Sequence, residues 1–237
     1  MEESLDRCEH FIASRRGAFV VTPNAEIVVA AQKNHELRAI INRSDLAIPD
    51  GAGLLLAAHI NREPLRMQVA GTDLAEQLCA LAADRGYRMF LLGGGPNVAR
   101  TAGKRLQERH TNLIIAGVFE GDSSLSGDVK CRERIQAAGR IDIIFVAFGA
   151  PRQELWMSRN CPTLNVPLAV GIGGAIDFLA GTLKRAPPRV RACNLDWLYR
   201  LIQQPWRWRR QLALPHFVLL VIDSAICRRF FRSHSPG

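Results

Sequence analysis

The chain has 237 residues, of which 48% are hydrophobic and 22% are charged. This composition supports a globular domain with a core and excludes an intrinsically disordered chain. The first residues, MEESLDRCEHF, are acidic and polar and are not typical of a signal peptide. No apolar run reaches the ~20 residues that a membrane-spanning helix needs, so we expect a soluble or peripheral protein.

The formal net charge of +9 is concentrated at the end of the chain. Residues 182–237 hold 11 basic and 2 acidic side chains, so the first 181 residues are neutral overall. A basic tail on a neutral body favours an anionic partner for the tail. The six cysteines form no CxxC pair and no metal-ligand spacing with histidine, so we expect no metal site. Their even number is compatible with disulfides, but their wide spacing favours buried, reduced thiols.

In chain order, short apolar runs alternate with helical patterns. The predicted strands are Ala18–Thr22, Leu46–Pro49, Arg88–Leu92, Leu113–Gly117, Ile141–Phe148 and Pro167–Ile172. The predicted helices include Ala25–Asn42, Thr72–Arg85, Asn97–Arg109 and Arg152–Asn160. The alternation predicts an α/β fold with a doubly wound, mostly parallel sheet, whose ligands bind beyond the carboxyl ends of the strands.

A stretch with two prolines, Lys184–Arg191, predicts a boundary near residue 190. We expect a sheet domain over residues 1–190 and a helical, basic C-terminal appendage over residues 191–237.

Two glycine-rich turns follow predicted strands and precede predicted helices. They contain Gly93 and Gly94 after the third strand, and Gly173 and Gly174 after the sixth. Backbone N–H groups in such a turn can hold a phosphate, although neither turn is a dinucleotide fingerprint or a Walker A loop. Each is equally consistent with a tight turn without a ligand, but two in one sheet favour a diphosphate-bearing ligand.

Asp50 is the acidic residue best placed for chemistry. It follows Pro49 at the end of a predicted strand and precedes Gly51, so its carboxylate is expected to face the ligand crevice. There it can act as a general base toward a hydroxyl group. A cap for the helix that begins near Ala52 is the competing interpretation, and the spacing alone slightly favours it.

Three other polar side chains follow strands. Thr22 and Asn24 can bind a sugar hydroxyl or amide, or can cap the next helix. Gln153 lies in the first turn of a predicted helix and offers donors and an acceptor to a sugar or a uracil edge, although a surface helix start explains it equally. The chain contains no DxD motif, so a metal-bridged nucleotide-sugar site has no support in the sequence.

Together these segments resemble the WecG/TagA/CpsF glycosyltransferase family (glycosyltransferase family 26), and within it the N-acetylmannosaminyltransferases. The resemblance runs in order from residue 22 to about residue 210. Its segments are TPNAEIVVAA, IPDGAGLLLA, FLLGGG, DIIFVAFGAPRQELWM, VGIGGAIDFLAGTLKRAPPRVR and NLDWLYRLIQQPWRWRR. The AFGAPRQE block and the GGAIDFLAG block carry most of its specificity.

The resemblance implies an inverting hexosyltransferase with a Rossmann-like sheet that needs no metal and no cofactor. The implied donor is UDP-N-acetylmannosamine or its uronic acid, and the implied acceptor is N-acetylglucosamine joined by diphosphate to a polyprenol, for teichoic acid or another surface polysaccharide. Carried over by motif, Asp50 resembles the catalytic base, and Thr22, Asn24 and Gln153 resemble pocket groups. Some relatives transfer glucose, and Pro23 departs from relatives with other residues before the Asn.

The tail interleaves Trp and Tyr with Arg, a pattern typical of a bilayer interface with anionic lipids. We therefore expect a cytoplasmic protein held peripherally on the inner face of the cell membrane. Packing on the sheet and a homo-oligomer interface are alternatives, and nucleic acid is disfavoured because the body has no basic face. Without a metal, arginines must hold the leaving diphosphate. The candidates are Arg185, Arg191, Arg200 and Arg207.

Two other functions stay open on the sequence alone. A UDP-glucose-type transferase of exopolysaccharide synthesis fits the same motifs. A non-catalytic, nucleotide-binding, membrane-associated protein fits the fold, although the intact PDG and PRQE segments argue against it. A dehydrogenase on the same sheet would need a dinucleotide fingerprint that the chain lacks.

Overall fold

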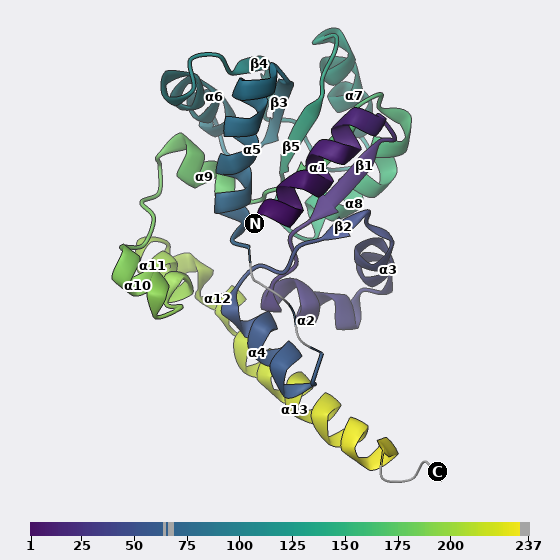
Figure 1. Cartoon of the computed structure of the whole chain (residues 1–237), viewed down its shortest axis with the longest axis vertical. Coiled ribbons are helices and arrows are strands. Elements are labelled where there is room, and N and C mark those ends of the chain that lie inside the picture. The colour runs from purple at the N-terminus through teal and green to yellow at the C-terminus, as the bar shows by residue number, and fades with distance from the viewer. Residues whose placement is uncertain (64, 66–68, 233–237) are drawn as a thin grey trace.

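The computed structural model describes residues 1–63, 65 and 69–232 (227–232 by their backbone alone) and shows a six-stranded sheet with helices on both faces (Figure 1). The strands are β1 (Ala18–Val21), β2 (Leu46–Ala47), β3 (Arg88–Gly93), β4 (Ile114–Phe119), β5 (Ile143–Ala147) and β6 (Leu168–Gly171). Their order is β2-β1-β6-β5-β3-β4, and every strand pair in the described residues is parallel. The predicted α/β, Rossmann-like fold and all six predicted strands are confirmed.

Apolar helix faces cover the sheet on both sides. One face packs against α1 (Glu2–Ser14), α5 (Gly71–Arg85), α6 (Val98–Arg109) and α9 (Ala175–Ala180). The other packs against α3 (His35–Arg43), α7 (Asp128–Ala137) and α8 (Arg152–Asn160), which is followed by the 3-10 turn η1 (Cys161–Thr163). Every residue of β5 is buried, as expected for a central parallel strand covered from both sides.

The predicted helix Ala25–Asn42 is wrong as a single element. It is divided into α2 (Ala25–Lys33) and α3 by Asn34, whose backbone is extended. The Asn34 side chain accepts a hydrogen bond from the N–H of Leu37 at 2.9 Å and so starts a new helix. The helices α1 and α7 lie outside the stretches named from periodicity.

The tail wraps around one end of the sheet and then leaves it. It comprises α10 (Pro188–Ala192), α11 (Asp196–Gln203), the 3-10 turn η2 (Pro205–Arg207), α12 (Trp208–Gln211) and α13 (Ala213–Arg232). Phe217 and Val221 of α13 pack against Ala25 of α2, and α13 then runs beside α4 (Ala52–Ile60) away from the body (Figure 1). No helix in the described residues is long and apolar enough to cross a membrane. The division at residue 190 stays a prediction.

Candidate active site

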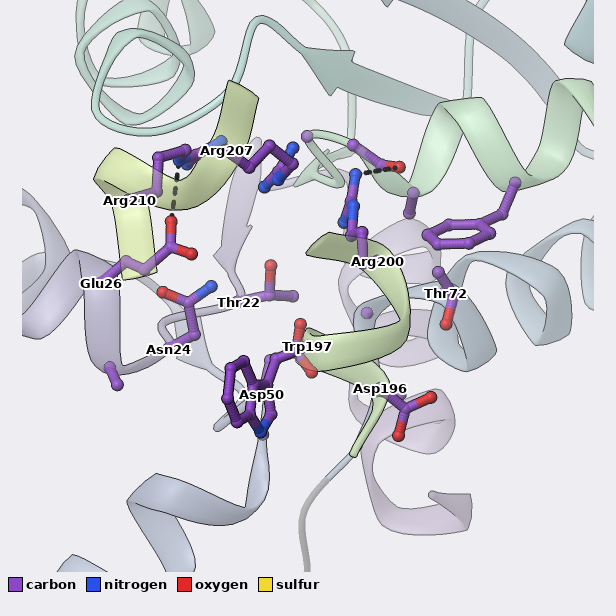
Figure 2. A pocket seen from close by; sticks show the side chains of 18 of the residues that line it. Thr22, Asn24, Glu26, Asp50, Thr72, Asp196, Trp197, Arg200, Arg207 and Arg210 are labelled. Atoms are coloured by element: carbon purple, nitrogen blue, oxygen red, sulfur yellow. Dashed lines mark hydrogen bonds and ion pairs between the residues drawn. The ribbon is translucent and has the colours of Figure 1, made fainter. Parts of the chain in front are cut away.

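The carboxyl ends of β1, β2, β5 and β6 open into a cavity of about 510 Å³ (Figure 2). One side, which we call the sheet wall, is formed by Thr22, Asn24, Asp50, Gln153, Gly173 and Gly174. The other side, the tail wall, is formed by Arg185, Arg191, Trp197, Arg200, Arg207 and Arg210. Ten of the twelve site residues predicted from the sequence therefore line one cavity.

Asp50 is half-buried on the sheet wall, between β2 and α4. The helix cap considered for it is not formed at α4, which begins after Gly51 (φ 92) without a side-chain cap. Instead, the Asp50 carboxylate accepts a hydrogen bond from the N–H of Gly71 at the start of α5. The Asp50 N–H donates to the carbonyl of Pro23 at 2.8 Å. Pro23, which differs from the residue that some relatives have at this position, therefore helps to hold this turn.

The surroundings of Asp50 change its acidity. Burial raises the pKa of the carboxyl to about 6, while the Gly71 N–H and the positive charge of Arg200 oppose that rise. The carboxyl is therefore largely ionised at pH 7 and still basic enough to accept a proton. Gly71 lies beside both Asp50 and Thr22, because a Cβ added to it would be in ordinary contact with Asp50 Oδ2 at 3.5 Å and with Thr22 Oγ1 at 3.7 Å.

Thr22 and Asn24 already have structural hydrogen bonds at the cavity. Thr22 Oγ1 donates to the carbonyl of Gly171 at 3.0 Å and ties the end of β1 to the end of β6. Asn24 Oδ1 accepts from the N–H of Ile27 at 3.0 Å, so the capping alternative holds for Asn24. Both residues also line the cavity, which leaves the Asn24 amide nitrogen as a donor for a ligand.

Gln153 is buried under the cavity at the start of α8. Its Oε1 accepts from the N–H of Gly149 at 3.2 Å, and its Nε2 donates to Glu154 Oε1 at 2.9 Å. Gly171 and Gly173 leave room for it, because a Cβ at either position would lie within 3.2 Å of the amide. Burial raises the pKa of Glu154, and its Oε2 has no hydrogen-bond partner among the described residues.

Arg200 reaches across the cavity from α11 to the turn after β6. Its Nη2 donates to the carbonyl of Gly174 at 3.1 Å, and its guanidinium lies 5.1 Å from the centre of the Phe178 ring. Asp177 is 3.8 Å away, a long separation for an ion pair. Burial lowers the pKa of Arg200, and its Nε is buried without a hydrogen-bond partner in the described part of the chain.

Arg207 sits between Arg200 and Arg210 (Figure 2). Burial and the two neighbouring guanidinium groups lower its pKa to about 10, so it remains a cation at pH 7. Arg210 is paired with Glu26 at 2.9 Å, but Arg207 forms no ion pair with any described residue, and its Nε is buried and unpartnered. Crowded cations with free donors form a site for an anion.

The two other predicted arginines lie at the edge of the cavity. Arg185 Nη1 pairs with Asp73 Oδ1 at 2.5 Å, and this hydrogen bond raises the pKa of Arg185. Arg191, on α10, lines the cavity without an ion pair among the described residues. No three His, Cys, Asp or Glu side chains gather into a metal site within residues 1–63, 65 and 69–232.

The comparison with known proteins decides the family. The family model described as "Glycosyl transferase WecG/TagA/CpsF family" matches residues 1–230. The chain belongs to this family. Two similar proteins are named N-acetylglucosaminyldiphosphoundecaprenol N-acetyl-beta-D-mannosaminyltransferase. One, from Bacillus subtilis (strain 168), is 31% identical over 228 residues, covering 94% of this chain and 86% of the relative. The other, from Bacillus spizizenii (strain ATCC 23059 / NRRL B-14472 / W23), is 33% identical over 212 residues, covering 90% and 81%.

In this family member, the two other predicted site residues, Gly93 and Gly94, do not line the cavity. Gly93 (φ 98) packs on β5, where a Cβ would lie 2.7 Å from the carbonyl carbon of Ala147, and the Gly94 N–H donates to the Ala147 oxygen at 3.0 Å. The Glu120 carboxylate accepts from the N–H of Asn97 at 2.7 Å, just before α6. A carboxylate there disfavours a bound phosphate, and phosphate binding at this turn stays an untested prediction.

Several residues at the site were not singled out from the sequence of this family member, among them Arg210 and Trp197 on the cavity wall and Asp177 beside Arg200. Arg210 was one of several similar tail arginines, and Trp197 was noted only as part of an aromatic pattern. Asp177 stands inside the recognisable GGAIDFLAG block, so that block carried a signal for it. Burial raises the pKa of Asp177, and it faces Arg200.

Proposed function

We propose that this transferase moves an N-acetylmannosamine-type sugar from a UDP donor to N-acetylglucosamine on a polyprenyl diphosphate, with inversion at the anomeric carbon. The names of the two Bacillus relatives support the sugar and the acceptor. One observation of this chain supports the mechanism most. Asp50 faces Arg200 and Arg207 across one cavity, with Thr22 between them (Figure 2).

The proposed reaction is a single displacement. The acceptor hydroxyl oxygen forms a bond to the anomeric carbon while the bond from that carbon to the donor phosphate oxygen breaks. The hydroxyl proton passes to Asp50, and the electron pair of the broken bond leaves with UDP. The growing negative charge on the diphosphate falls beside the guanidinium groups of Arg200 and Arg207, each of which has an Nε without an acceptor among the described residues.

The tail has a second proposed role, which is to hold the enzyme at the inner face of the cell membrane. Exposed Trp206, Trp208 and Ile202 lie among tail arginines. Aromatic and basic side chains of this kind favour an anionic lipid surface. If removal of residues 192–237 left full turnover of a soluble acceptor analogue, the tail would be an anchor and would not complete the catalytic site. A homo-oligomer through the tail stays a prediction.

A panel of donors tests the reaction. UDP-N-acetylmannosamine, its uronic acid and UDP-glucose are each offered with a polyprenyl-diphosphate-linked N-acetylglucosamine acceptor, and disaccharide-lipid is measured by mass spectrometry. We expect the N-acetylated mannose donors to be used and the new linkage to have the anomeric configuration opposite to the donor. Transfer from UDP-glucose alone would support the exopolysaccharide alternative. No transfer from any donor would contradict the proposed function.

A further inference from the structure

The helix α4, in the catalytic part of the chain, carries an apolar surface that nothing in the described chain covers. Its sequence, AGLLLAAHI, has no acidic residue and no fully buried residue. Leu56 is 60% exposed, and Ile60, one turn further, is also exposed. The two side chains lie on one face of the helix because residues four apart are neighbours on its surface.

A different face of α4 packs against α13. Gly53 at the start of α4 faces Phe217, where an added Cβ would lie 3.6 Å from the ring, and Asn61 at its end bonds Ser224 Oγ at 3.2 Å. The two helices therefore run in the same direction along the contact, and Figure 1 shows them side by side beyond the sheet. The contact partly buries Leu54 and Ala57 of α4.

The helix α13 has its own exposed apolar stripe. It consists of Val218, Leu219, Ile222 and Ile226, with Leu219 65% exposed. At 3.6 residues per turn, Leu56 and Ile60 lie roughly a quarter turn before the face of α4 that meets α13. Val218 and Ile222 lie roughly a quarter turn after the face of α13 that meets α4. Since the helices run parallel, both rotations lead to the same side of the pair, and the stripes form one apolar face.

We infer that this face of α4 and α13 inserts into the bilayer surface, so that the catalytic part of the chain contacts lipid directly beside Asp50. The inference rests on the proposed function, because an acceptor joined to a polyprenol stays in the bilayer. The charge supports a lipid occupant: Arg62 follows α4, and Arg228 and Arg229 lie near the end of α13 in sequence. Asp223 is the one charged residue of 213–227 and limits insertion to the interfacial zone.

Contact of α4 with lipid would also position Asp50. Only Gly51 separates Asp50 from the first residue of α4, and Gly53 and Leu214 line both the cavity and the root of the helix pair. Insertion of α4 therefore fixes the height of the Asp50 carboxylate above the lipid surface. The acceptor sugar extends from that surface by the length of its diphosphate, which is a fixed chemical spacer.

The test is co-sedimentation of the full-length protein with vesicles of phosphatidylcholine containing phosphatidylglycerol, and with phosphatidylcholine alone. The variant is the double substitution Leu56→Gln with Ile60→Gln. The control is Leu125→Gln with Val129→Gln, which removes exposed apolar side chains (74% and 54% exposed) that lie away from the helix pair. Thermal melting and circular dichroism establish that both variants stay folded.

We expect the α4 variant to bind anionic vesicles about tenfold more weakly than wild type, and the control to bind unchanged. Turnover should fall for the polyprenyl acceptor in vesicles, through a raised KM, and stay unchanged for a water-soluble short-chain acceptor. Unaltered vesicle affinity of the α4 variant would overturn the inference. So would a change from dimer to monomer in light scattering with vesicle affinity unaltered, because the face would then bind a second copy.

Vesicle binding needs no turnover, so the two proposals fail separately. Absence of transfer by wild type with every donor contradicts the proposed function and leaves the binding result intact. Normal transfer with equal vesicle binding by wild type and the α4 variant contradicts this inference alone.

Discussion

The two walls of the cavity satisfy their polar groups in different ways. On the sheet wall, Thr22, Asp50 and Gln153 each take part in hydrogen bonds with backbone groups of neighbouring turns. On the tail wall, Arg200 and Arg207 are half-buried, and each has a buried Nε without an acceptor in the described residues. Thr22, Asp50 and Gln153 are thus held by the protein itself, whereas the tail wall leaves cationic donors for an anion. We propose that the sheet wall positions the acceptor and the base, and that the tail wall binds the leaving diphosphate.

The largest expected effect comes from removing the base of the sheet wall. Asp50→Asn keeps the shape and the hydrogen bond from Gly71 but cannot accept the proton, so kcat should fall by about 10²–10⁴-fold. Initial rates with the preferred donor measure this, and circular dichroism checks the fold. A near-normal rate in a folded Asn variant would remove Asp50 from the role of base.

The pH profile sharpens the same assignment. Burial raises the pKa of Asp50 to about 6, and the base must be ionised to act. The rate should therefore be constant above about pH 7 and fall about tenfold per unit as pH drops below about 6. Initial rates from pH 4.5 to 8.5 measure it, with folding followed at each pH. A profile that stays flat down to pH 5 would contradict a base with this pKa.

A smaller effect is expected where the two walls touch. A Cβ at Gly174 would lie 2.0 Å from Arg200 Nη2, so Gly174→Ala must displace the guanidinium from its place. Loss of one positioned charge should lower kcat/KM about 10–100-fold. Gly53→Ala is the matched control for a glycine of the cavity, because a Cβ there meets only ordinary contacts, the nearest at 3.6 Å from the Phe217 ring. Equal rates for Gly174→Ala and wild type would place the Arg200 guanidinium elsewhere during catalysis.

The smallest expected effect is on stability and runs opposite to activity. Asp50 has a folded-state pKa of about 6 against an ordinary 3.8, so its ionised form opposes folding. The penalty is absent below about pH 4, grows between pH 4 and 6, and is complete above that. Asp50→Asn should therefore raise the free energy of unfolding by about 1–3 kcal/mol at pH 7. Urea unfolding of both proteins at pH 7 and at pH 4 measures the difference in the free energy of unfolding. An equal gain at the two pH values would show that the ionised Asp50 carboxylate is not its cause.

Much of the fold and the sheet wall could be predicted because the signals are local. The apolar runs marked all six strands, and the turns after them contained Thr22, Asp50 and Gln153. The break at Asn34 was missed because the apolar spacing of α2 and α3 continues across it, while the cap depends on one side-chain hydrogen bond.

The glycine turns and the tail arginines show where local signals fail. Gly94 and Gly174 stand in similar sequences, yet only the turn after β6 reaches the cavity, because β6 lies beside β1 and β3 does not. The sequence around the eleven basic residues of 182–237 does not show which of them bind a ligand and which form ion pairs. Burial of the Nε atoms of Arg200 and Arg207, and pairing of Arg210 with Glu26, depend on contacts between segments far apart in the chain.

Calorimetric binding of UDP and uridine tests the division between the two walls most directly. Arg207→Gln should weaken UDP binding at least tenfold and leave uridine binding unchanged, because Arg207 is assigned to the diphosphate. Asp50→Asn should bind UDP as well as wild type, since it removes a negative charge from the opposite wall. Arg209→Gln, a neighbouring tail arginine that does not line the cavity, is the control. Unchanged UDP affinity in Arg207→Gln, or a loss in Asp50→Asn as large as in Arg207→Gln, would contradict the assignment of the anion site to the tail wall.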